Sequence, residues 1–303
     1  MLSRRELLLT PAALAALTSL ESAPAEAAGR MTLAMHQQTS APAGFRRSLE
    51  GWAKAGIRQV EITGALLDPF LKTESLAAAK SLLSDLGLKA VSGSGGNAGL
   101  LEAGPDRTAT LDAFKVRCEQ WATLGIPIIY STTGSTTKPT ADLYKAAAGH
   151  AREVADIARQ FSLTALFEFQ RTSTFVSTLP TMLSITRAAA APNLGVLFDC
   201  YHFWSGLGKL ADLDGVKPGE IRHVHFQDVP DLPREMLDQT TRAIPGDGVS
   251  PLTEILRKLS ARGYAGPLSV ELLLPQFTTR DPFAVATEIK PKAEAVMKKA
   301  RVL

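Results

Sequence analysis

The sequence predicts a single (β/α)8 barrel of the TIM type over residues 29–303. Three observations support this fold class. Short runs rich in Val, Ile, Leu and Phe alternate with segments of helical period along the whole range. The helical segments repeatedly end in a glycine, as at Gly56 and Gly87, before the next apolar run begins. Eight strands fit the chain, each followed by a helix except the sixth, which a short segment joins to the seventh, and a closed barrel of this kind takes about 250 residues.

The first half of the chain contains four of these strand–helix units. In 111–125 the apolar residues recur along one helical face, and Thr140 is a suitable N-cap for the helix that follows it. The expected strands lie at 31–36, 59–63, 89–94 and 127–132, and the expected helices lie at 44–56, 74–87, 111–125 and 140–161.

The second half has the more continuous apolar runs, which are typical of parallel strands buried on both faces. The expected strands lie at 164–169, 194–204, 221–229 and 268–273, and the expected helices lie at 180–190, 250–263 and 282–300. The long loops 93–110 and 228–249 both follow strands. We therefore expect them at the catalytic mouth of the barrel.

An open, doubly wound sheet is the competing fold class. It would require a glycine-rich phosphate-binding loop after the first strand. The segment HQQTSAPAG at 36–44 contains no GxGxxG pattern. The closed barrel is therefore preferred.

Residues 1–28 have the pattern of a twin-arginine export signal. Arg4 and Arg5 precede an uncharged stretch at 7–20, and Ala25-Glu26-Ala27 forms an A-x-A cleavage pattern. The stretch is too short for a membrane span, which needs about 20 apolar residues. We expect an exported, periplasmic protein. A frayed basic N-terminus on a cytosolic enzyme is the competing interpretation.

Composition excludes some function classes. The formal net charge of +3 is too small to indicate binding to nucleic acid or to an anionic membrane surface. The two cysteines, Cys118 and Cys200, fall on different expected elements, so buried free thiols are favoured over a disulfide.

Each of four successive apolar strands ends in a group that can bind a metal ion. These residues are Glu168, Asp199, His225 and Glu271. The carboxyl ends of barrel strands meet at one mouth, so the four side chains should converge there. Three carboxylates in one place would repel each other unless a cation lay among them. We expect one divalent ion, with Mn²⁺ favoured over Mg²⁺, Co²⁺ and Zn²⁺.

The stretch 164–277 resembles the xylose isomerase-like barrel superfamily of sugar isomerases and epimerases, and within it the inosose isomerase branch. The resemblance rests on the motifs ALFEF, VLFDCYHFW, HVHFQDVPDLPREMLDQTTRAIPGDGVSPL and SVELLLPQF. It implies that Glu168, Asp199, His225 and Glu271 are the metal ligands and that the two glutamates also carry protons. It also implies that His202 and Arg242 contact substrate oxygens.

This chain departs from the resembling pattern at the substrate rim. Gln227 stands two residues after the expected ligand His225, where many relatives carry Lys. Gln276 and Phe277 stand where the inosose branch usually has an acidic residue and tyrosines. The identity of the sugar therefore does not carry over from the resemblance.

Two further residues have two interpretations each, and a third has one. His36 ends the first strand and Glu61 lies on the second, and both can contact substrate there. Alternatively, His36 is a strand-end histidine whose hydrogen bonds are satisfied within the protein, and Glu61 forms an ion pair. His223 is expected to point away from His225, into the helix layer.

The expected function is metal-dependent isomerisation or epimerisation of an unphosphorylated keto-sugar or keto-polyol through an enediolate. A lyase acting on a 3-keto-sugar or glycoside shares the first proton transfer and stays open. A non-catalytic sugar-binding protein is a further alternative. An abasic-site endonuclease is disfavoured, because the second and third strands offer no additional histidine ligands. The expected partner is a small sugar or polyol, with no nucleic acid and no stable membrane insertion; homo-oligomerisation stays open.

Overall fold

The computed structural model describes residues 30–303 except 97, 98 and 105. The expected export signal at 1–28 lies outside the described residues. In the part that is described, no helix is both long enough and apolar enough to cross a membrane.

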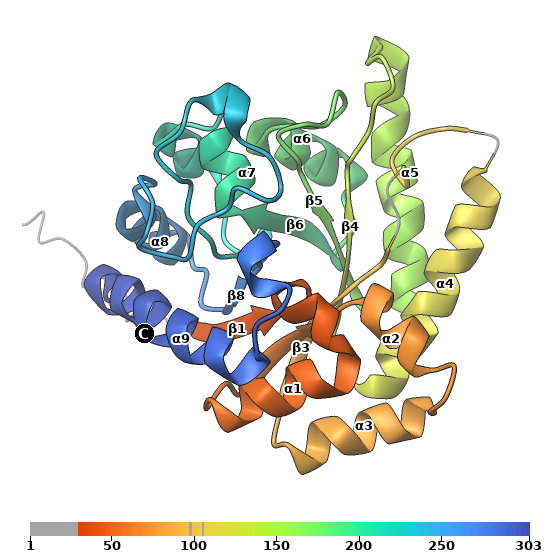
Figure 1. Cartoon of the computed structure of the whole chain (residues 1–303). Helices are drawn as coiled ribbons and strands as arrows, with labels where there is room; N and C mark the ends of the chain where they lie inside the picture. The colour runs from red at the N-terminus through yellow and green to blue at the C-terminus, as the bar shows by residue number, and fades with distance from the viewer. Residues whose placement is uncertain (1–29, 97–98, 105) are drawn as a thin grey trace, which may run out of the picture.

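Eight parallel strands close into a barrel in chain order, with β1 paired to both β2 and β8 (Figure 1). This confirms the predicted fold class and excludes the open sheet. The strands are β1 Thr32–His36, β2 Gln59–Ile62, β3 Lys89–Ser94, β4 Ile128–Thr132, β5 Thr164–Glu168, β6 Leu194–Asp199, β7 Ile221–His225 and β8 Pro267–Val270.

Helices surround the strands, and α9 packs beside α1 where the ring closes (Figure 1). The α-helices are α1 Gly44–Lys54, α2 Gly64–Phe70, α3 Leu76–Asp85, α4 Arg107–Leu124, α5 Ala141–Gln160, α6 Leu179–Ala189, α7 Cys200–Ser205, α8 Leu252–Ala261 and α9 Pro282–Ala300. Short 3-10 helices are η2 Gln37–Ala43, η3 Leu210–Gly215, η4 Arg234–Met236 and η5 Pro275–Phe277.

Two of these helices differ from the sequence prediction. Helix α2 was not expected, and residues 200–204 form most of α7 rather than the end of a strand. The reason for α7 is local: the Asp199 carboxylate accepts a hydrogen bond from the backbone N–H of His202 and caps the helix. The apolar run therefore changes from strand to helix at Asp199.

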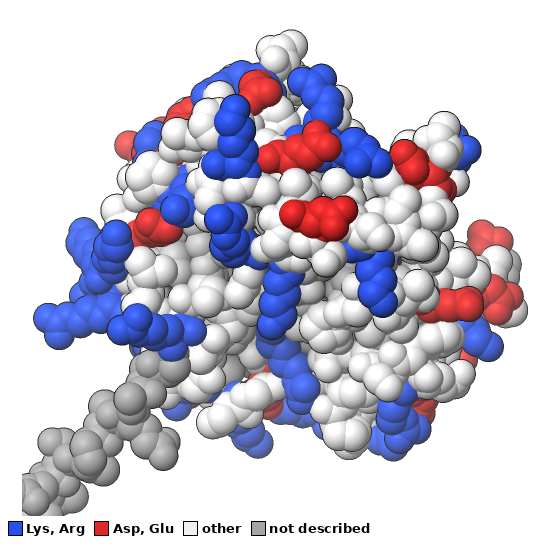
Figure 2. All heavy atoms as spheres, turned by 90° about the horizontal axis from the view of Figure 1, so that it is seen from below, with Lys and Arg blue, Asp and Glu red and all other residues white. Residues whose placement is uncertain are grey.

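The hydrophobic core is divided by the sheet. Most buried apolar side chains, including Trp52, Trp121 and Phe198, lie in one cluster shared with the helices. A smaller cluster on β4, β5 and β6 contains Tyr130, Leu166 and Leu197. Cys118 and Cys200 are free and buried, as predicted. Figure 2 shows the molecule from below the view of Figure 1, with Lys and Arg interspersed among uncharged and acidic side chains.

Strand register sets the position of the site residues along the barrel axis. Asp199 on β6 is the register partner of His225 on β7, and Glu168 on β5 pairs with Leu197, two residues before Asp199. Glu271 follows the last residue of β8 directly. All four groups therefore lie at the carboxyl ends of neighbouring strands, where TIM barrels place their chemistry.

Candidate active site

The four predicted metal ligands converge on one point. One ligand atom from each of Glu168, Asp199, His225 and Glu271 lies within 4.8 Å of every other. Nδ1 of His225 is 3.0 Å from Glu168 Oε1, 3.4 Å from Glu271 Oε2 and 3.6 Å from Asp199 Oδ2. Three of the four side chains are almost fully buried, and that of Glu271 is 13% exposed. The imidazole thus presents one nitrogen to three carboxylates.

Asp199 is held at both carboxylate oxygens. Oδ1 accepts from the backbone N–H of His202 at 2.6 Å, which is the cap of α7. Oδ2 accepts from the side-chain amide of Gln227 at 2.6 Å. Burial opposes the charged form of Asp199, but the nearby cationic and imidazole groups, His202 and Arg242 foremost, lower its pKa. Asp199 is therefore a fixed, ionised carboxylate.

Arg242 contacts two carboxylates of the cluster. Its Nη1 forms an ion pair with Glu271 Oε2 and lies 3.5 Å from Asp199 Oδ2. Its Nη2 lies 3.4 Å from Nε2 of His202 and 2.6 Å from Oε1 of Gln239. The structure therefore brings Arg242 and His202 to the same site as the four predicted ligands.

The loop that carries Arg242 is organised around Asp228. The Asp228 carboxylate accepts hydrogen bonds from the backbone N–H groups of Gly246, Gly248 and Ser250, at 2.9 to 3.1 Å. A Cβ atom at Gly248 would lie 2.2 Å from the carbonyl oxygen of Val229, so only glycine fits there. The PGDG motif is thus a structural support for Arg242.

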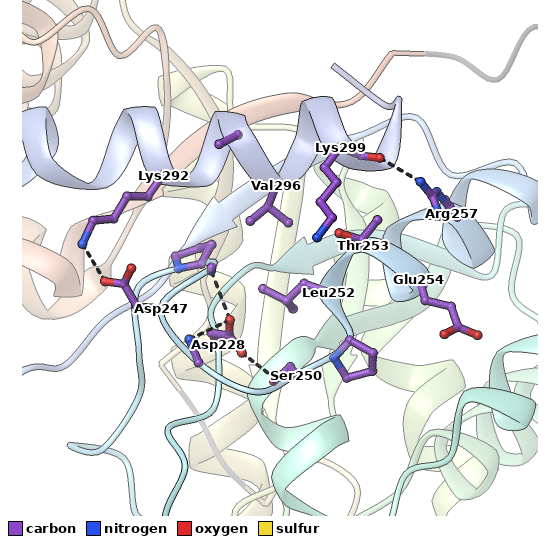
Figure 3. A pocket seen from close by; sticks show the side chains of 15 residues that line it. Asp228, Asp247, Ser250, Leu252, Thr253, Glu254, Arg257, Lys292, Val296 and Lys299 are labelled. Carbon is purple, nitrogen blue, oxygen red and sulfur yellow. Dashed lines mark hydrogen bonds and ion pairs between the residues drawn. The ribbon is translucent and has the colours of Figure 1, made fainter.

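A hollow of about 570 Å³ lies on the other side of this loop, between the loop, α8 and α9 (Figure 3). Lys292 forms an ion pair with Asp247 at 2.6 Å at its edge, as drawn in Figure 3. None of the four predicted metal ligands lines this hollow. The chemistry-bearing groups are instead packed within the barrel mouth.

Glu61 lies behind His225, with no solvent exposure of its side chain. Its Oε1 is 3.0 Å from Nε2 of His225, and its Oε2 is 2.7 Å from Nε2 of His223. The structure shows the ion pair that one of the two interpretations of Glu61 expects, and a contact of Glu61 with substrate stays a prediction. The predicted orientation of His223 is wrong: residues two apart on a strand face the same side, so His223 points into the barrel with His225.

His36 and Tyr130 form a second pair at the site. Nε2 of His36 is 2.8 Å from the Tyr130 hydroxyl and 3.7 Å from Glu271 Oε1. Both side chains are almost fully buried. Sequence reasoning missed Tyr130. Strand alternation from Thr132, the register partner of Glu168, would have placed it on the inner face of β4.

The two glutamates of the cluster differ in protonation. Burial raises the pKa of Glu168 to about 8, although His225 beside it acts in the opposite direction. Burial also acts on Glu271, but the Arg242 guanidinium outweighs it and keeps the pKa of Glu271 below its ordinary value. Burial lowers the pKa of His202 to about 4, so its imidazole is neutral. Two carboxylates with separated pKa values are a common basis for acid and base roles.

The donor set fits a divalent metal ion. Three carboxylates and one imidazole nitrogen face one point, and the second imidazole nitrogen is occupied by Glu61. Hard oxygen ligands with one histidine suit Mn²⁺, Mg²⁺ or Zn²⁺. Metal-bound histidines commonly contact a carboxylate through the other ring nitrogen.

The sequence profile described as "Xylose isomerase-like TIM barrel" matches residues 49–296, which is most of the chain and includes all four predicted ligands. The chain belongs to this family. This match confirms the resemblance to xylose isomerase-like barrels that the sequence motifs predicted.

Individual relatives cover less of the sequence. An inosose isomerase of Halalkalibacterium halodurans is 27% identical over 167 residues, which are 54% of this chain and 59% of that protein. A 3-dehydroshikimate dehydratase of Pseudomonas putida is 31% identical over 99 residues, covering 32% of this chain and 16% of that protein. The chain thus spans about three fifths of the inosose isomerase and much less of the dehydratase.

The fold is shared over a greater length. The crystal structure of the IOLI protein with a bound zinc atom superposes with a TM-score of 0.82, covering 89% of this chain and 99% of that one at 22% identity. At this identity the comparison establishes the barrel architecture.

Proposed function

We propose that the protein is a divalent-metal-dependent isomerase or epimerase of an unphosphorylated keto-sugar or keto-polyol. The observation that carries the proposal is that Glu168 and Glu271 lie 3.0 and 3.4 Å from His225 Nδ1, with their pKa values shifted in opposite directions. The similarity to inosose isomerases over about half of the chain supports the same class of substrate.

The proposed ion is held by Glu168, Asp199, His225 and Glu271. When bound, it would polarise a carbonyl oxygen and the neighbouring hydroxyl of the substrate and so make the intervening C–H more acidic. We favour Mn²⁺ because three of the four donors are carboxylate oxygens; the zinc atom in the IOLI structure makes Zn²⁺ the main alternative.

The glutamates would move the proton. One carboxylate accepts the proton as the C–H bond breaks, and the electron pair passes into an enediolate of the substrate. Return of a proton from the opposite carboxylate to the same carbon gives an epimer, and return to the neighbouring carbon gives an isomer. Arg242 and His202 lie 3.4 Å apart at the mouth and would donate hydrogen bonds to the enediolate oxygens.

A lyase is the second candidate function. Its support is the 3-dehydroshikimate dehydratase relative, which is 31% identical over the matched stretch. The first proton transfer would be the same, and a β-leaving group would then depart. A protein that binds sugar without turnover would not require two carboxylates with such different pKa values.

The proposed location is outside the cytoplasm. The support is the pattern of Arg4, Arg5, the uncharged stretch and the A-x-A site in the first 28 residues. A free, unphosphorylated sugar is the more available substrate in that compartment.

One experiment separates these functions. The Mn²⁺-loaded protein is incubated with candidate keto-sugars in D2O, removed by filtration, and the sugars are followed by NMR. Deuterium on the carbon beside the carbonyl, or proton transfer to its neighbour, with every other substrate atom retained, supports the isomerase or epimerase. Loss of water or of an aglycone identifies a lyase. Absence of exchange on every substrate, despite a bound ion, overturns the enzymatic proposal.

A further inference from the structure

A chain of three buried side chains lies below the predicted metal ligands. His223 Nε2 contacts Glu61 Oε2 at 2.7 Å, and Glu61 Oε1 contacts His225 Nε2 at 3.0 Å. The three side chains have no solvent exposure. Glu61 belongs to β2 and the histidines belong to β7, and β1 and β8 lie between these strands in the barrel. Glu61 thus reaches across the barrel interior to both rings.

The chemistry of the chain fixes where the ring protons lie. An ionised carboxylate only accepts hydrogen bonds, so each contacting imidazole nitrogen must carry a proton. Each oxygen of Glu61 contacts one ring nitrogen, Oε1 that of His225 at 3.0 Å and Oε2 that of His223 at 2.7 Å, so both oxygens act as acceptors. Nδ1 of His223 is buried and has no hydrogen-bond partner among the described residues, which also favours a proton on Nε2 of that ring.

The consequence falls on His225. When Nε2 carries the proton that Glu61 accepts, the neutral ring has its lone pair on Nδ1. Nδ1 is the nitrogen that faces Glu168, Asp199 and Glu271. The same contact restrains rotation of the ring about its bond to the backbone.

We propose that Glu61, held in place by His223, is a positioning residue that selects the Nε2–H tautomer of His225 and aims its Nδ1 at the metal ion. This inference rests on the proposed metal site but not on which sugar is converted. Glu61 touches neither the proposed substrate nor the proposed ion. It acts only through His225, and it carries a negative charge that makes the ring a better donor to a cation.

A second metal site is the competing explanation of the same residues. His36, Glu61 and His225 also place one ligand atom each within 4.8 Å of one another. An ion there would need His225 Nε2 without a proton, whereas the 3.0 Å contact with Glu61 Oε1 is a normal hydrogen-bond distance. The two explanations therefore differ in the protonation of one atom and in the number of ions bound.

The test compares Glu61→Gln and Glu61→Leu with the wild-type chain. Zn²⁺ affinity is measured by competition with a chromophoric chelator, and the ring nitrogens of the Zn²⁺-loaded protein are observed by ¹⁵N NMR. We expect one Zn²⁺ per wild-type chain and a protonated Nε2 on His225. Both variants should bind Zn²⁺ about 10- to 100-fold more weakly, which is the usual effect of losing such a partner. The Gln side chain could still accept a hydrogen bond through its oxygen, whereas Leu cannot accept one at all.

The matched control is Glu220→Gln. Glu220 also accepts two side-chain hydrogen bonds, from Arg187 at 2.6 and 2.7 Å, and one from the backbone N–H of Lys217 at 2.7 Å, but it lies outside the predicted ligand set. This control should lower thermal stability without changing Zn²⁺ affinity. If Glu61 had only a structural role, its variants would behave like this control, with lower thermal stability and unchanged Zn²⁺ affinity. That result would overturn the proposal.

Other outcomes also count against it. Two Zn²⁺ ions per chain, or a wild-type His225 with an unprotonated Nε2, would establish the second metal site instead. A wild-type chain that binds no divalent ion would overturn this proposal together with the metal assignment. If Zn²⁺ affinity falls as expected but no sugar is turned over, the positioning role stands and the proposed function fails.

Discussion

Gln227 donates its side-chain amide to Oδ2 of Asp199 at 2.6 Å, while the other oxygen of Asp199 caps α7. Both oxygens of this carboxylate are therefore fixed before a ligand arrives. The Oε1 atom of Gln227 is buried and has no hydrogen-bond partner among residues 30–303 as described. An amide at this position orients Asp199 without adding a positive charge beside the proposed ion, as a lysine would.

Replacing Gln227 by Leu should weaken metal binding. The change removes a hydrogen bond to a buried carboxylate, which is worth about 1.5–3 kcal/mol. If all of this free energy is lost from metal binding, Mn²⁺ affinity falls about 10- to 100-fold. Titration with Mn²⁺ by calorimetry measures the effect. Gln276→Leu, on η5, is the control and should bind Mn²⁺ like the wild type. Unchanged affinity in Gln227→Leu would show that α7 alone positions Asp199.

Replacing Arg242 by Gln should change metal affinity and turnover in opposite directions. The guanidinium pairs with Glu271 and lies 3.5 Å from Asp199, so it repels a cation held by these carboxylates. Its loss should tighten Mn²⁺ binding. The same change removes a charged donor to the enediolate, so kcat should fall about 100-fold.

Steady-state kinetics at saturating Mn²⁺ and a separate binding titration distinguish the two effects of Arg242→Gln. Asp247→Asn changes a residue of the same loop whose ion pair with Lys292 faces away from the cluster, and it should alter neither quantity strongly. Parallel loss of affinity and turnover in Arg242→Gln would mean that the loop has collapsed rather than that one charge was removed.

Metal affinity should increase with pH. Burial disfavours the charged form of His225, but Glu61, Glu271 and Glu168 together raise its pKa well above the ordinary value. A ring protonated at both nitrogens must release the Nδ1 proton before it can bind an ion, and Glu168, whose pKa is raised to about 8, must also lose its proton. Each proton released increases affinity about tenfold per pH unit below the corresponding pKa.

The measurement for this pH dependence is a series of Zn²⁺ titrations from about pH 6 to about pH 9, a range that brackets the ordinary imidazole value and the raised pKa of Glu168, about 8. The slope of log Kd against pH gives the number of protons released. A flat profile would show that the ligand set is already deprotonated in the metal-free protein.

The strand ends were the predictable part of this molecule. Glu168, Asp199, His225 and Glu271 follow apolar runs, and barrel closure brings such positions together whatever the side chains are. The contacts within the site were less accessible to sequence reasoning. The switch from strand to helix at residue 200 depends on one carboxylate capping a turn, and the apolar pattern of 194–204 is compatible with either element.

Glu61 and Tyr130 show a different limit. Their partners are separated from them by 162 and 94 residues, respectively, so no local spacing connects Glu61 with His223 or Tyr130 with His36. Alternation along a strand can identify which residues face inward, but it was not applied to Tyr130 and was misapplied to His223. Which inward residues touch each other depends on barrel diameter and strand tilt, and these follow only from the closed structure.

Replacing Arg4 and Arg5 by Lys should retain the precursor in the cytoplasm. The proposed export signal depends on the arginine pair, and lysine keeps the charge while losing the guanidinium groups that identify the signal. Cell fractionation and the size of the protein on a gel measure export and cleavage. The single replacement Arg30→Lys, after the proposed cleavage site, serves as the control. Continued export of the double variant would remove the twin-arginine interpretation and leave the active-site argument intact.

Replacing Glu168 and replacing Glu271 should have different effects on proton exchange. Glu168→Gln and Glu271→Gln each remove one proton carrier and weaken one metal contact, and both should lose turnover by at least about 100-fold at saturating metal. If each carboxylate serves one face of the substrate, a variant lacking the returning group can still remove the proton. It should then exchange the substrate C–H with D2O while forming no epimer or isomer.

The variant lacking the group that removes the proton should show neither exchange nor product. Running each variant from both substrate and product, with deuterium incorporation followed by NMR, assigns the two faces. Far-ultraviolet circular dichroism and Mn²⁺ titration confirm that each variant is folded and loaded. Equal exchange from both directions in both variants would show that neither glutamate carries the proton. The base would then have to be sought among the remaining buried groups of the mouth, beginning with His36, whose Nε2 lies 3.7 Å from Glu271 Oε1.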